Sequence, residues 1–145
     1  MYKHILIPTD GSPLSYIAVD KGLELAKALG ARVTAVVVVE PFHIFASESN
    51  RISNLRSEYD KQIWEKAAQY LGVAKEKAAA LGVELDTVEI ENDRPFESII
   101  ETATKKGCDL IAMATHGRGG VGSIVLGSQT QKVLTHTKLP VLVFR

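Results

Sequence analysis

The stretch Ala26-Lys27-Ala28-Leu29-Gly30, followed by the apolar run Val33–Val39, sets the pattern of this chain. The same order of helix-forming residues, a glycine and an apolar run recurs at 78–82 before 83–90 and at 103–107 before 108–114. Glycine directly after a helix adopts the left-handed conformation that closes the helix end. The repeated alternation therefore predicts an α/β fold, in which helices cover both faces of a parallel sheet.

These junctions and the apolar runs between them predict five strands and four helices. The strands are Ile5–Thr9, Val33–Val39, Leu85–Ile90, Leu110–Ala114 and Val141–Phe144, and the helices are Leu14–Leu29, roughly Ser53–Leu81, Pro95–Lys106 and Gln129–Thr137. Most strands are continuous apolar runs, as in strands buried on both faces, but the third is more polar and is expected at an edge. A doubly wound sheet of this kind commonly has the order 3-2-1-4-5, and its ligand crevice lies where strands 1 and 4 end.

Local signals refine the helix ends. Ser12 followed by Pro13 predicts a cap and a first helical turn, and Ser128 with Gln131 matches a capping box. The long second helix contains Gly72, which costs stability in a helix interior. Its aromatic residues are interpreted as packing; they are Tyr59, Trp64 and Tyr70. Residues 40–52 form the one long irregular link and could cover a site.

Length and composition predict a single domain over residues 1–145. A hydrophobic content of 46%, a charged content of 23% and a net charge of zero give no indication of a general nucleic-acid or membrane-surface binder. The longest apolar stretch is too short to span a bilayer, and the first residues do not resemble a signal peptide. Cys108 is the only cysteine, so no intrachain disulfide can form, which fits the cytoplasm.

A glycine-containing loop follows the fourth strand: Ala114-Thr115-His116-Gly117, nine residues, then Gly127-Ser128. Backbone amides in such a loop can turn inward together, and a helix N-terminus adds partial positive charge, so the segment is typical of a phosphate site. No acidic residue follows Asp109, whereas four basic ones do: Arg118, Lys132, Lys138 and Arg145. The alternative is a flexible glycine loop without a ligand.

Two more specific phosphate motifs fit poorly. Residues 117–122 read Gly-Arg-Gly-Gly-Val-Gly, but this literal dinucleotide fingerprint follows the fourth strand and no acidic residue downstream could hold a ribose. A Gly-x-x-x-x-Gly-Lys-[Ser/Thr] sequence is absent, which excludes the P-loop mechanism with its lysine.

Side chains at the two strand ends admit a structural and a functional interpretation. The structural interpretation of Asp10 is an Asx turn that leads into the first helix. The functional interpretation is a carboxylate that contacts ribose hydroxyls or a phosphate-bound Mg²⁺. The two interpretations are compatible. His116 and Arg118 are either a solvated loop pair or donors to phosphate. His116 could act as a general base, although the sequence pairs it with no orienting carboxylate.

The remaining reactive residues give weaker signals. Three histidines show no metal-ligand spacing and are expected at the surface or at strand ends; they are His4, His43 and His136. Cys108 is expected to be a small buried hydrophobe. Ser12 lacks the context of a nucleophile and is interpreted as the helix cap.

Several of these segments resemble the universal stress protein family, and the resemblance covers essentially the whole chain. It is carried by Ile5-Leu6-Ile7-Pro8-Thr9-Asp10-Gly11-Ser12, by Val38-Val39-Glu40-Pro41, by Pro140-Val141-Leu142-Val143 and by the glycine loop. Nucleotide-binding members carry Gly-x-x-Gly, nine residues, then Gly-[Ser/Thr]. Ala114 replaces the first of these glycines, and members that do not bind nucleotide usually lose the glycines of this loop.

The resemblance implies where ATP or AMP would bind. It places adenine near Pro8, Thr9 and the main chain of Val38, and Asp10 near ribose or metal. It places Met113, Ala114 and Gly117 on the ribose and α-phosphate side. The outer phosphates would be held by Gly127, Ser128, Gln129 and Thr130.

The resemblance also implies a nucleotide-occupied dimeric sensor or regulator with weak or absent hydrolysis. The last strand, Val141–Phe144, is an apolar edge that could pair with its copy in a homodimer. We therefore expect a cytoplasmic ATP- or AMP-binding regulatory protein that an unknown protein partner recognises. Two alternatives stay open, a dimeric interaction module with an empty crevice and a slow ATPase that uses Asp10 and His116.

Overall fold

The structure, a computed structural model, describes residues 1–42, 50–117 and 126–145. Its elements follow one another as β1 (His4–Pro8), α1 (Pro13–Leu29), β2 (Arg32–Val39), α2 (Asn50–Leu81), β3 (Leu85–Glu91), α3 (Pro95–Lys106), β4 (Leu110–Ala114), α4 (Ser128–His136) and β5 (Val141–Phe144). The predicted alternation of strands and helices is confirmed, and the predicted bounds differ from these by three residues at most.

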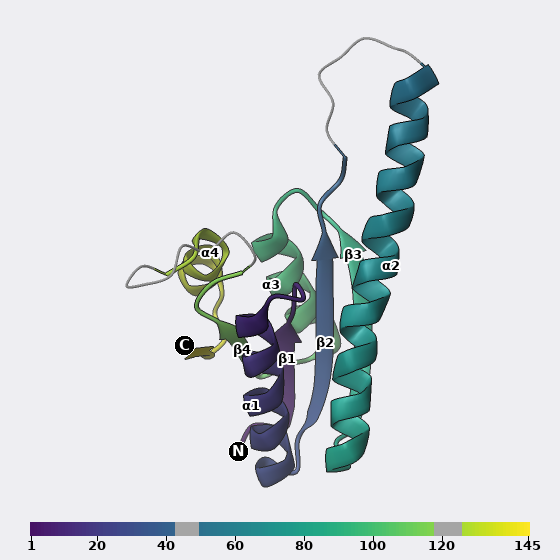
Figure 1. Ribbon diagram of the computed structural model, residues 1–145. Coiled ribbons are helices and arrows are strands. Elements are labelled where there is room, and N and C mark those ends of the chain that lie inside the picture. The colour runs from purple at the N-terminus through teal and green to yellow at the C-terminus, as the bar shows by residue number, and fades with distance from the viewer. Residues whose placement is uncertain (43–49, 118–125) are drawn as a thin grey trace.

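The five strands form one parallel sheet in the order β3-β2-β1-β4-β5, as the sequence predicts. Figure 1 shows β1 and β2 in the middle of the molecule, with α1 and α2 in front and to the right and α3 behind the sheet. The upper part of α2 extends well past the end of the sheet. This order puts β1 beside β4, so the loops that follow these two strands lie at the same edge.

The core has two layers, one on each face of the sheet. Ile5 and Ile7 of β1 face α1 and α2, where Leu23 and Leu71 join the same apolar cluster. Leu6, between them, faces the other way into the cluster that includes residues of α3 and α4. Successive side chains of a strand point to opposite faces, so burial on both faces requires a continuous apolar run.

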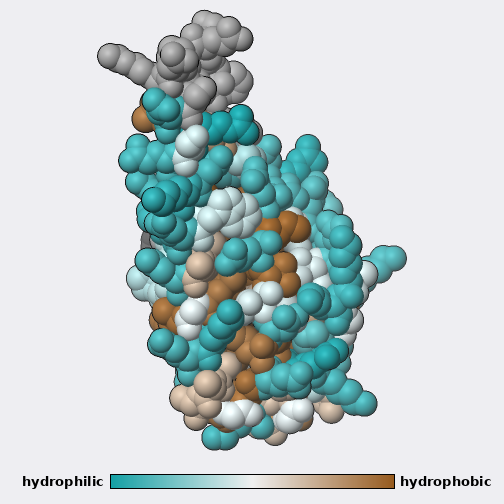
Figure 2. Space-filling view, turned by 90° about the vertical axis from the view of Figure 1, so that its right-hand side faces the viewer, coloured by the Kyte–Doolittle hydropathy of each residue, from teal (hydrophilic) through white to brown (hydrophobic). Residues whose placement is uncertain are grey.

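The strand β3 is an edge strand, as its polar residues predict. Asp86, Glu89 and Glu91 are exposed, while Val88 and Ile90 are half-buried against the sheet. Figure 2, which views the molecule from the right-hand side of Figure 1, shows apolar residues in the middle of this face, surrounded by hydrophilic ones. Charged side chains on an edge strand oppose pairing with another chain.

The helix ends confirm most of the local predictions. Gly30, Gly82 and Gly107 have φ of 65°, 71° and 72°, the left-handed conformation expected after a helix. The Ser15 amide donates to Ser12 Oγ at 3.2 Å, so Ser12 caps α1.

The prediction of a capping box at the start of α4 is wrong. The N-cap is Gly127, which has no side chain, and Ser128 is already the first helical residue. Gln131 is then one position too far along the helix for a capping box, and its Nε2 donates to the Leu126 carbonyl at 3.2 Å instead. An N-cap without a side chain leaves the first amides of α4 to another partner.

Substitution of Gly72 by alanine is expected to stabilise the protein. Gly72 lies inside α2, and a Cβ placed there would meet nothing within 4 Å. Alanine should raise the free energy of unfolding by about 0.5 to 1 kcal/mol because it restricts the unfolded chain and favours the helix. Thermal unfolding should show a midpoint higher by about 2 to 3 °C.

Gly82→Ala is the matched control for this prediction. A Cβ at Gly82 would also meet nothing within 4 Å, but the φ of 71° is one that alanine disfavours. This variant should therefore be less stable than the wild type by about 1 kcal/mol. If Gly72→Ala and Gly82→Ala shifted the midpoint of thermal unfolding equally, the backbone conformation of the two glycines would not explain the effect.

His4 is at a strand end, as predicted, but it is not at the surface. Only 5% of it is exposed, because β1 is the central strand and β2 packs along it. Its Nε2 lies 2.7 Å from Thr34 Oγ1, while Nδ1 has no hydrogen-bond partner among the residues that the structure describes. Burial, together with the positive charge of Arg32, holds the pKa of His4 below its ordinary value of 6.5.

This lowered pKa makes stability depend on pH in a defined direction. Below pH 6.5 the unfolded chain binds a proton at His4 that the folded protein does not, so stability falls as the pH decreases through that value. Asp86 titrates at lower pH, because the hydrogen bond from Lys106 holds its pKa below the ordinary value of 3.8. A His4→Gln variant should lose less stability in urea titrations between about pH 7 and pH 5 than the wild type does. The same pH dependence in both proteins would assign it to other groups.

Candidate functional site

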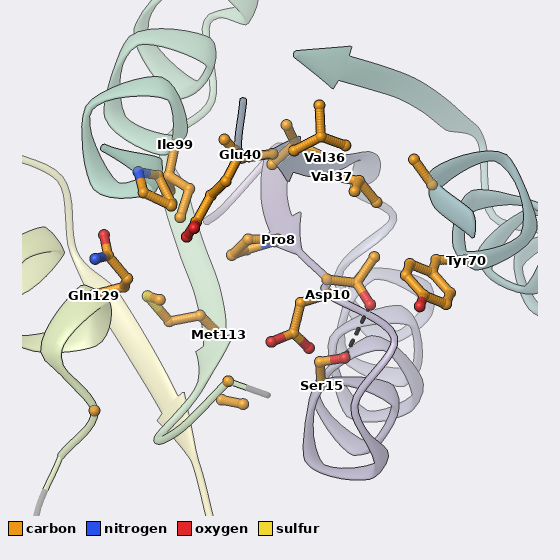
Figure 3. Close-up of a pocket in the computed structure, with 18 of the residues that line it drawn as sticks. Pro8, Asp10, Ser15, Val36, Val37, Glu40, Tyr70, Ile99, Met113 and Gln129 are labelled. Atoms are coloured by element: carbon orange, nitrogen blue, oxygen red, sulfur yellow. Dashed lines mark hydrogen bonds between the residues drawn. The ribbon is translucent and has the colours of Figure 1, made fainter. Parts of the chain in front are cut away.

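A pocket of about 690 Å³ opens at the carboxyl edge of the sheet, where β1, β2 and β4 end. Figure 3 shows side chains from these strand ends and from helices α1, α2, α3 and α4 around it, with Pro8, Asp10 and Met113 near its middle. All the predicted site residues that the structure describes line it: Pro8, Thr9, Asp10, Val38, Met113, Ala114, His116, Gly117, Gly127, Ser128, Gln129 and Thr130. Arg118 lies outside the described residues. The role of these residues in binding stays a prediction.

The turn after β1 presents Asp10 to the pocket. The Ser12 amide donates to Asp10 Oδ1 at 2.9 Å, which confirms the Asx turn into α1. Thr9 Oγ1 and Ser15 Oγ lie 3.0 Å apart and tie the strand end to the first turn of α1. Asp10 therefore has the structural role that the sequence predicts and also lines the pocket.

The turn after β1 meets the loop after β4 at the Asp10 carboxylate. A Cβ built on Gly117 would lie 2.5 Å from Asp10 Oδ2, a distance that real side chains do not tolerate. Glycine at this position therefore leaves room for the Asp10 carboxylate as it is placed. The predicted convergence of the ends of β1 and β4 is present in the structure.

The chain that leaves β4 is tied to the chain that enters α4. The Gly127 amide donates to the Thr115 carbonyl at 2.8 Å, and Thr130 Oγ1 donates to the Ala114 carbonyl at 2.9 Å. A Cβ on Gly127 would lie 3.1 Å from the Thr115 carbonyl oxygen, so this approach also depends on glycine. These contacts direct the first turn of α4 at the pocket.

Ala114 does not obstruct this arrangement. It is the last residue of β4 and pairs with Phe144 of β5, so its backbone is extended. A strand residue does not need the positive φ that favours glycine. The methyl group at this position is therefore compatible with an open pocket.

Two helix N-termini, those of α3 and α4, lie at the pocket. The first amides of α4 have no partner inside the helix, and Ser128, Gln129 and Thr130 line the pocket there. At the start of α3, the Phe96 amide donates to Gln129 Oε1 at 3.0 Å. Helix N-termini favour anions, so phosphate or another anionic group suits this end of the pocket.

The charged side chains of the pocket wall are acidic. Within residues 1–42, 50–117 and 126–145, the lining has the carboxylates of Asp10 and Glu40 and neither lysine nor arginine. Figure 3 shows both carboxylates directed toward the interior. His116 Nδ1 lies 3.0 Å from Thr115 Oγ1, a hydroxyl rather than an orienting carboxylate. Backbone amides therefore carry most of the attraction for an anion in this part of the wall.

Sequence reasoning missed the contribution of α2. Its residues Tyr59, Ile63, Ala67 and Tyr70 line the pocket. The prediction that the aromatic residues of α2 pack against the core is confirmed for Trp64 and Tyr70. It is incomplete, because α2 extends past the sheet (Figure 1) and Tyr70 also lines the pocket. Helical spacing identifies an inward face and cannot tell whether a sheet or a cavity lies opposite.

The other reactive residues lie away from this pocket. Cys108 is buried, and burial raises the pKa of its thiol to about 11, as expected of an unreactive core residue. His136 is exposed on α4, where its Nδ1 lies 2.8 Å from the Lys132 carbonyl oxygen. His43 lies outside the described residues. In the part of the chain that the structure describes, no group of three or more His, Cys, Asp or Glu could hold a metal ion.

None of the described helices is both long enough and apolar enough to cross a membrane.

Comparison with known proteins gives a consistent result. Residues 1–145 match the sequence profile of the universal stress protein family. Universal stress protein MJ0531 of Methanocaldococcus jannaschii is 36% identical over 145 residues, which cover 100% of this chain and 83% of that protein.

Solved structures agree in fold. Universal stress protein UspA from Lactobacillus plantarum superposes with a TM-score of 0.84 at 25% identity, over 99% of this chain and 98% of that one. A universal stress protein in complex with cAMP superposes with a TM-score of 0.72, also at 25% identity, over 99% of this chain and 97% of that one.

Proposed function

The chain belongs to the universal stress protein family, and on this premise we propose that it is a regulatory protein that binds ATP or AMP. The observation that carries the proposal is the pocket between the end of β1 and the first turn of α4, lined by the glycines of the phosphate-binding pattern. The similar structure that contains cAMP supports an adenine nucleotide as the ligand.

The proposed orientation follows the chemistry of the wall. Adenine lies against Pro8, Thr9 and Val38, where the wall is largely apolar. Ribose and the α-phosphate lie near Met113, Ala114 and Gly117. The outer phosphates meet the start of α4 at Gly127, Ser128, Gln129 and Thr130, where backbone amides and the helix dipole favour negative charge.

Asp10 is the proposed contact to ribose or to a phosphate-bound Mg²⁺. Mg²⁺ commonly binds through one or two carboxylates together with phosphate oxygens, and Asp10 could supply one of them. His116 and Arg118 complete the proposed phosphate contacts.

If Mg²⁺ takes part, EDTA should weaken the binding of ATP more than the binding of AMP, because ATP carries more charge that the cation offsets.

Copurified nucleotide gives a direct test of this proposal. Protein purified rapidly without added nucleotide should release a purine on denaturation, and ion-exchange chromatography against standards should identify it as AMP or ATP. Protein purified in the same way after complete unfolding and refolding is the control, and it should release none. A native preparation that releases none and later binds neither nucleotide would favour the interaction module with an empty crevice.

We also propose that the protein forms a homodimer through β5 and acts in the cytoplasm, where a protein partner recognises the nucleotide-bound state. The strand β5 pairs with β4 along one edge, and its other edge ends the sheet. Leu142, 38% exposed, is a large apolar residue on this strand. Pairing of this edge with a second copy would cover the open edge of β5.

A Leu142→Glu variant tests the homodimer. A carboxylate at each copy of this position would oppose pairing by charge repulsion and by the cost of burial. Light scattering coupled to gel filtration should give a dimer for the wild type and a monomer for the variant. Exposed Leu134 of α4 offers a control, and Leu134→Glu should stay dimeric. A dimeric Leu142→Glu variant would place the interface elsewhere.

A further inference from the structure

Tyr70 of α2 packs directly against the turn that carries Asp10. A Cβ built on Gly11 would overlap the ring of Tyr70, and Gly11 has a φ of 77°. The turn therefore lies in close contact with the ring, in a conformation that favours glycine. Figure 3 shows Tyr70 beside Asp10 and Ser15 at one end of the pocket.

The position of this turn determines the position of the Asp10 carboxylate. Oδ1 accepts the hydrogen bond from the Ser12 amide at 2.9 Å, two residues along the same turn. Oδ2 faces Gly117 so closely that a Cβ there would lie 2.5 Å from it. A rotation of the backbone at Gly11 would move the carboxylate away from both neighbours.

The ring of Tyr70 in turn packs against α1. It meets the ring of Tyr16 edge-on, with 6.5 Å between centroids and 78° between planes. Lys77 Nζ lies 5.4 Å from the centroid of the Tyr16 ring and 2.6 Å from Asp20 Oδ1. Aromatic contacts of this kind have a preferred geometry, so Tyr70 has a defined position before any ligand enters.

We propose that Tyr70 is a positioning residue of the nucleotide site: it holds the Asp10–Gly11 turn and thereby directs the Asp10 carboxylate at the ligand. The inference rests on the proposed function for the identity of the ligand. It adds that α2 contributes to affinity through Asp10, and not only as a wall of the pocket.

The first test needs no ligand and follows the Ser12 amide, which reports on the turn. In Tyr70→Ala, hydrogen exchange at Ser12 measured by NMR should be at least about tenfold faster than in the wild type, because the turn opens more often. Tyr70→Phe keeps the ring and should leave the rate unchanged. Buried amides in the middle of α1 are the internal control and should not change.

The second test is a double-mutant cycle with AMP. Tyr70→Ala should weaken AMP binding about tenfold in the wild-type background and less than about twofold in Asp10→Asn, since its effect passes through Asp10. Tyr59→Ala is the matched control, because Tyr59 is an aromatic residue of α2 that lines the same pocket. It should weaken binding by the same factor in both backgrounds.

Tyr70→Leu replaces Tyr70→Ala in both tests if the alanine variant does not fold, because leucine keeps apolar bulk in the core. An unchanged Ser12 exchange rate in the folded variant would overturn the proposal. An equal loss of affinity in the two backgrounds would also overturn it. If the wild type binds no AMP, the proposed function fails, whereas the Ser12 measurement still decides whether Tyr70 holds the turn.

Discussion

A Gly127→Val variant is expected to fold and to lose at least about 30-fold in affinity for AMP and Mg-ATP, which corresponds to about 2 kcal/mol of binding free energy. A Cβ at Gly127 would already lie 3.1 Å from the Thr115 carbonyl oxygen and 3.3 Å from His116 Cα. The two further methyl groups of valine require the start of α4 to move away from the end of β4. The amides of the first turn then no longer face the phosphates.

The backbone of Gly127 is not itself an obstacle to this variant. Its φ of −60° and ψ of 153° are allowed for valine, and its N-cap position contributes no side-chain hydrogen bond. Circular dichroism and thermal unfolding should therefore show a folded protein. Gly72→Ala, a glycine substitution in open space, is the control and should bind as the wild type does. A folded Gly127→Val variant with unchanged affinity would refute the assigned phosphate site.

A Leu6→Ala variant should lose about 3 kcal/mol or more of unfolding free energy, the largest loss of stability predicted here. Leu6 is 0% exposed, on the central strand, in the cluster of the α3 and α4 face. Truncation removes apolar contacts and leaves a cavity that the close-packed sheet cannot fill. In a chain of this length the midpoint of thermal unfolding should fall by about 10 °C.

Leu55→Ala is the matched control for this substitution, because the same atoms are removed from a side chain that is 54% exposed on α2. It should change stability by less than about 0.5 kcal/mol. Urea unfolding gives the free energy of unfolding of both variants, and an unchanged m-value shows that the difference is one of stability. A small effect at Leu6 would contradict the placement of β1 between two apolar layers.

The order of the elements could be predicted because each signal was local and repeated. Glycine closes the helix ends at Gly30, Gly82 and Gly107, and an apolar run follows each. The topology is the order 3-2-1-4-5 that is common in doubly wound sheets, and this order brings the ends of β1 and β4 together. The spacing of Gly117, Gly127 and Ser128 in the sequence also predicted the side of the pocket that these residues line.

Other parts of the pocket depend on contacts that sequence spacing does not contain. Tyr70 has the spacing of a core residue, and only the path of α2 past the sheet shows that it also lines the pocket. His4 has the position of a strand-end residue and is buried because its strand is central. The capping box failed by one residue, since Gly127 rather than Ser128 begins the turn. In each case the environment of the residue depends on segments distant in the sequence that contact it, and not on its neighbours along the chain.

The most direct test of the central claim is calorimetric titration of nucleotide-free protein with AMP and with Mg-ATP. We predict saturable binding with one site per chain and a dissociation constant near 1 μM, about −8 kcal/mol, together with a higher midpoint of thermal unfolding in excess ligand. Absence of heat and of any thermal shift with both nucleotides, in protein shown to be folded, would contradict the account. The pocket would then belong to an interaction module that does not bind adenine nucleotide.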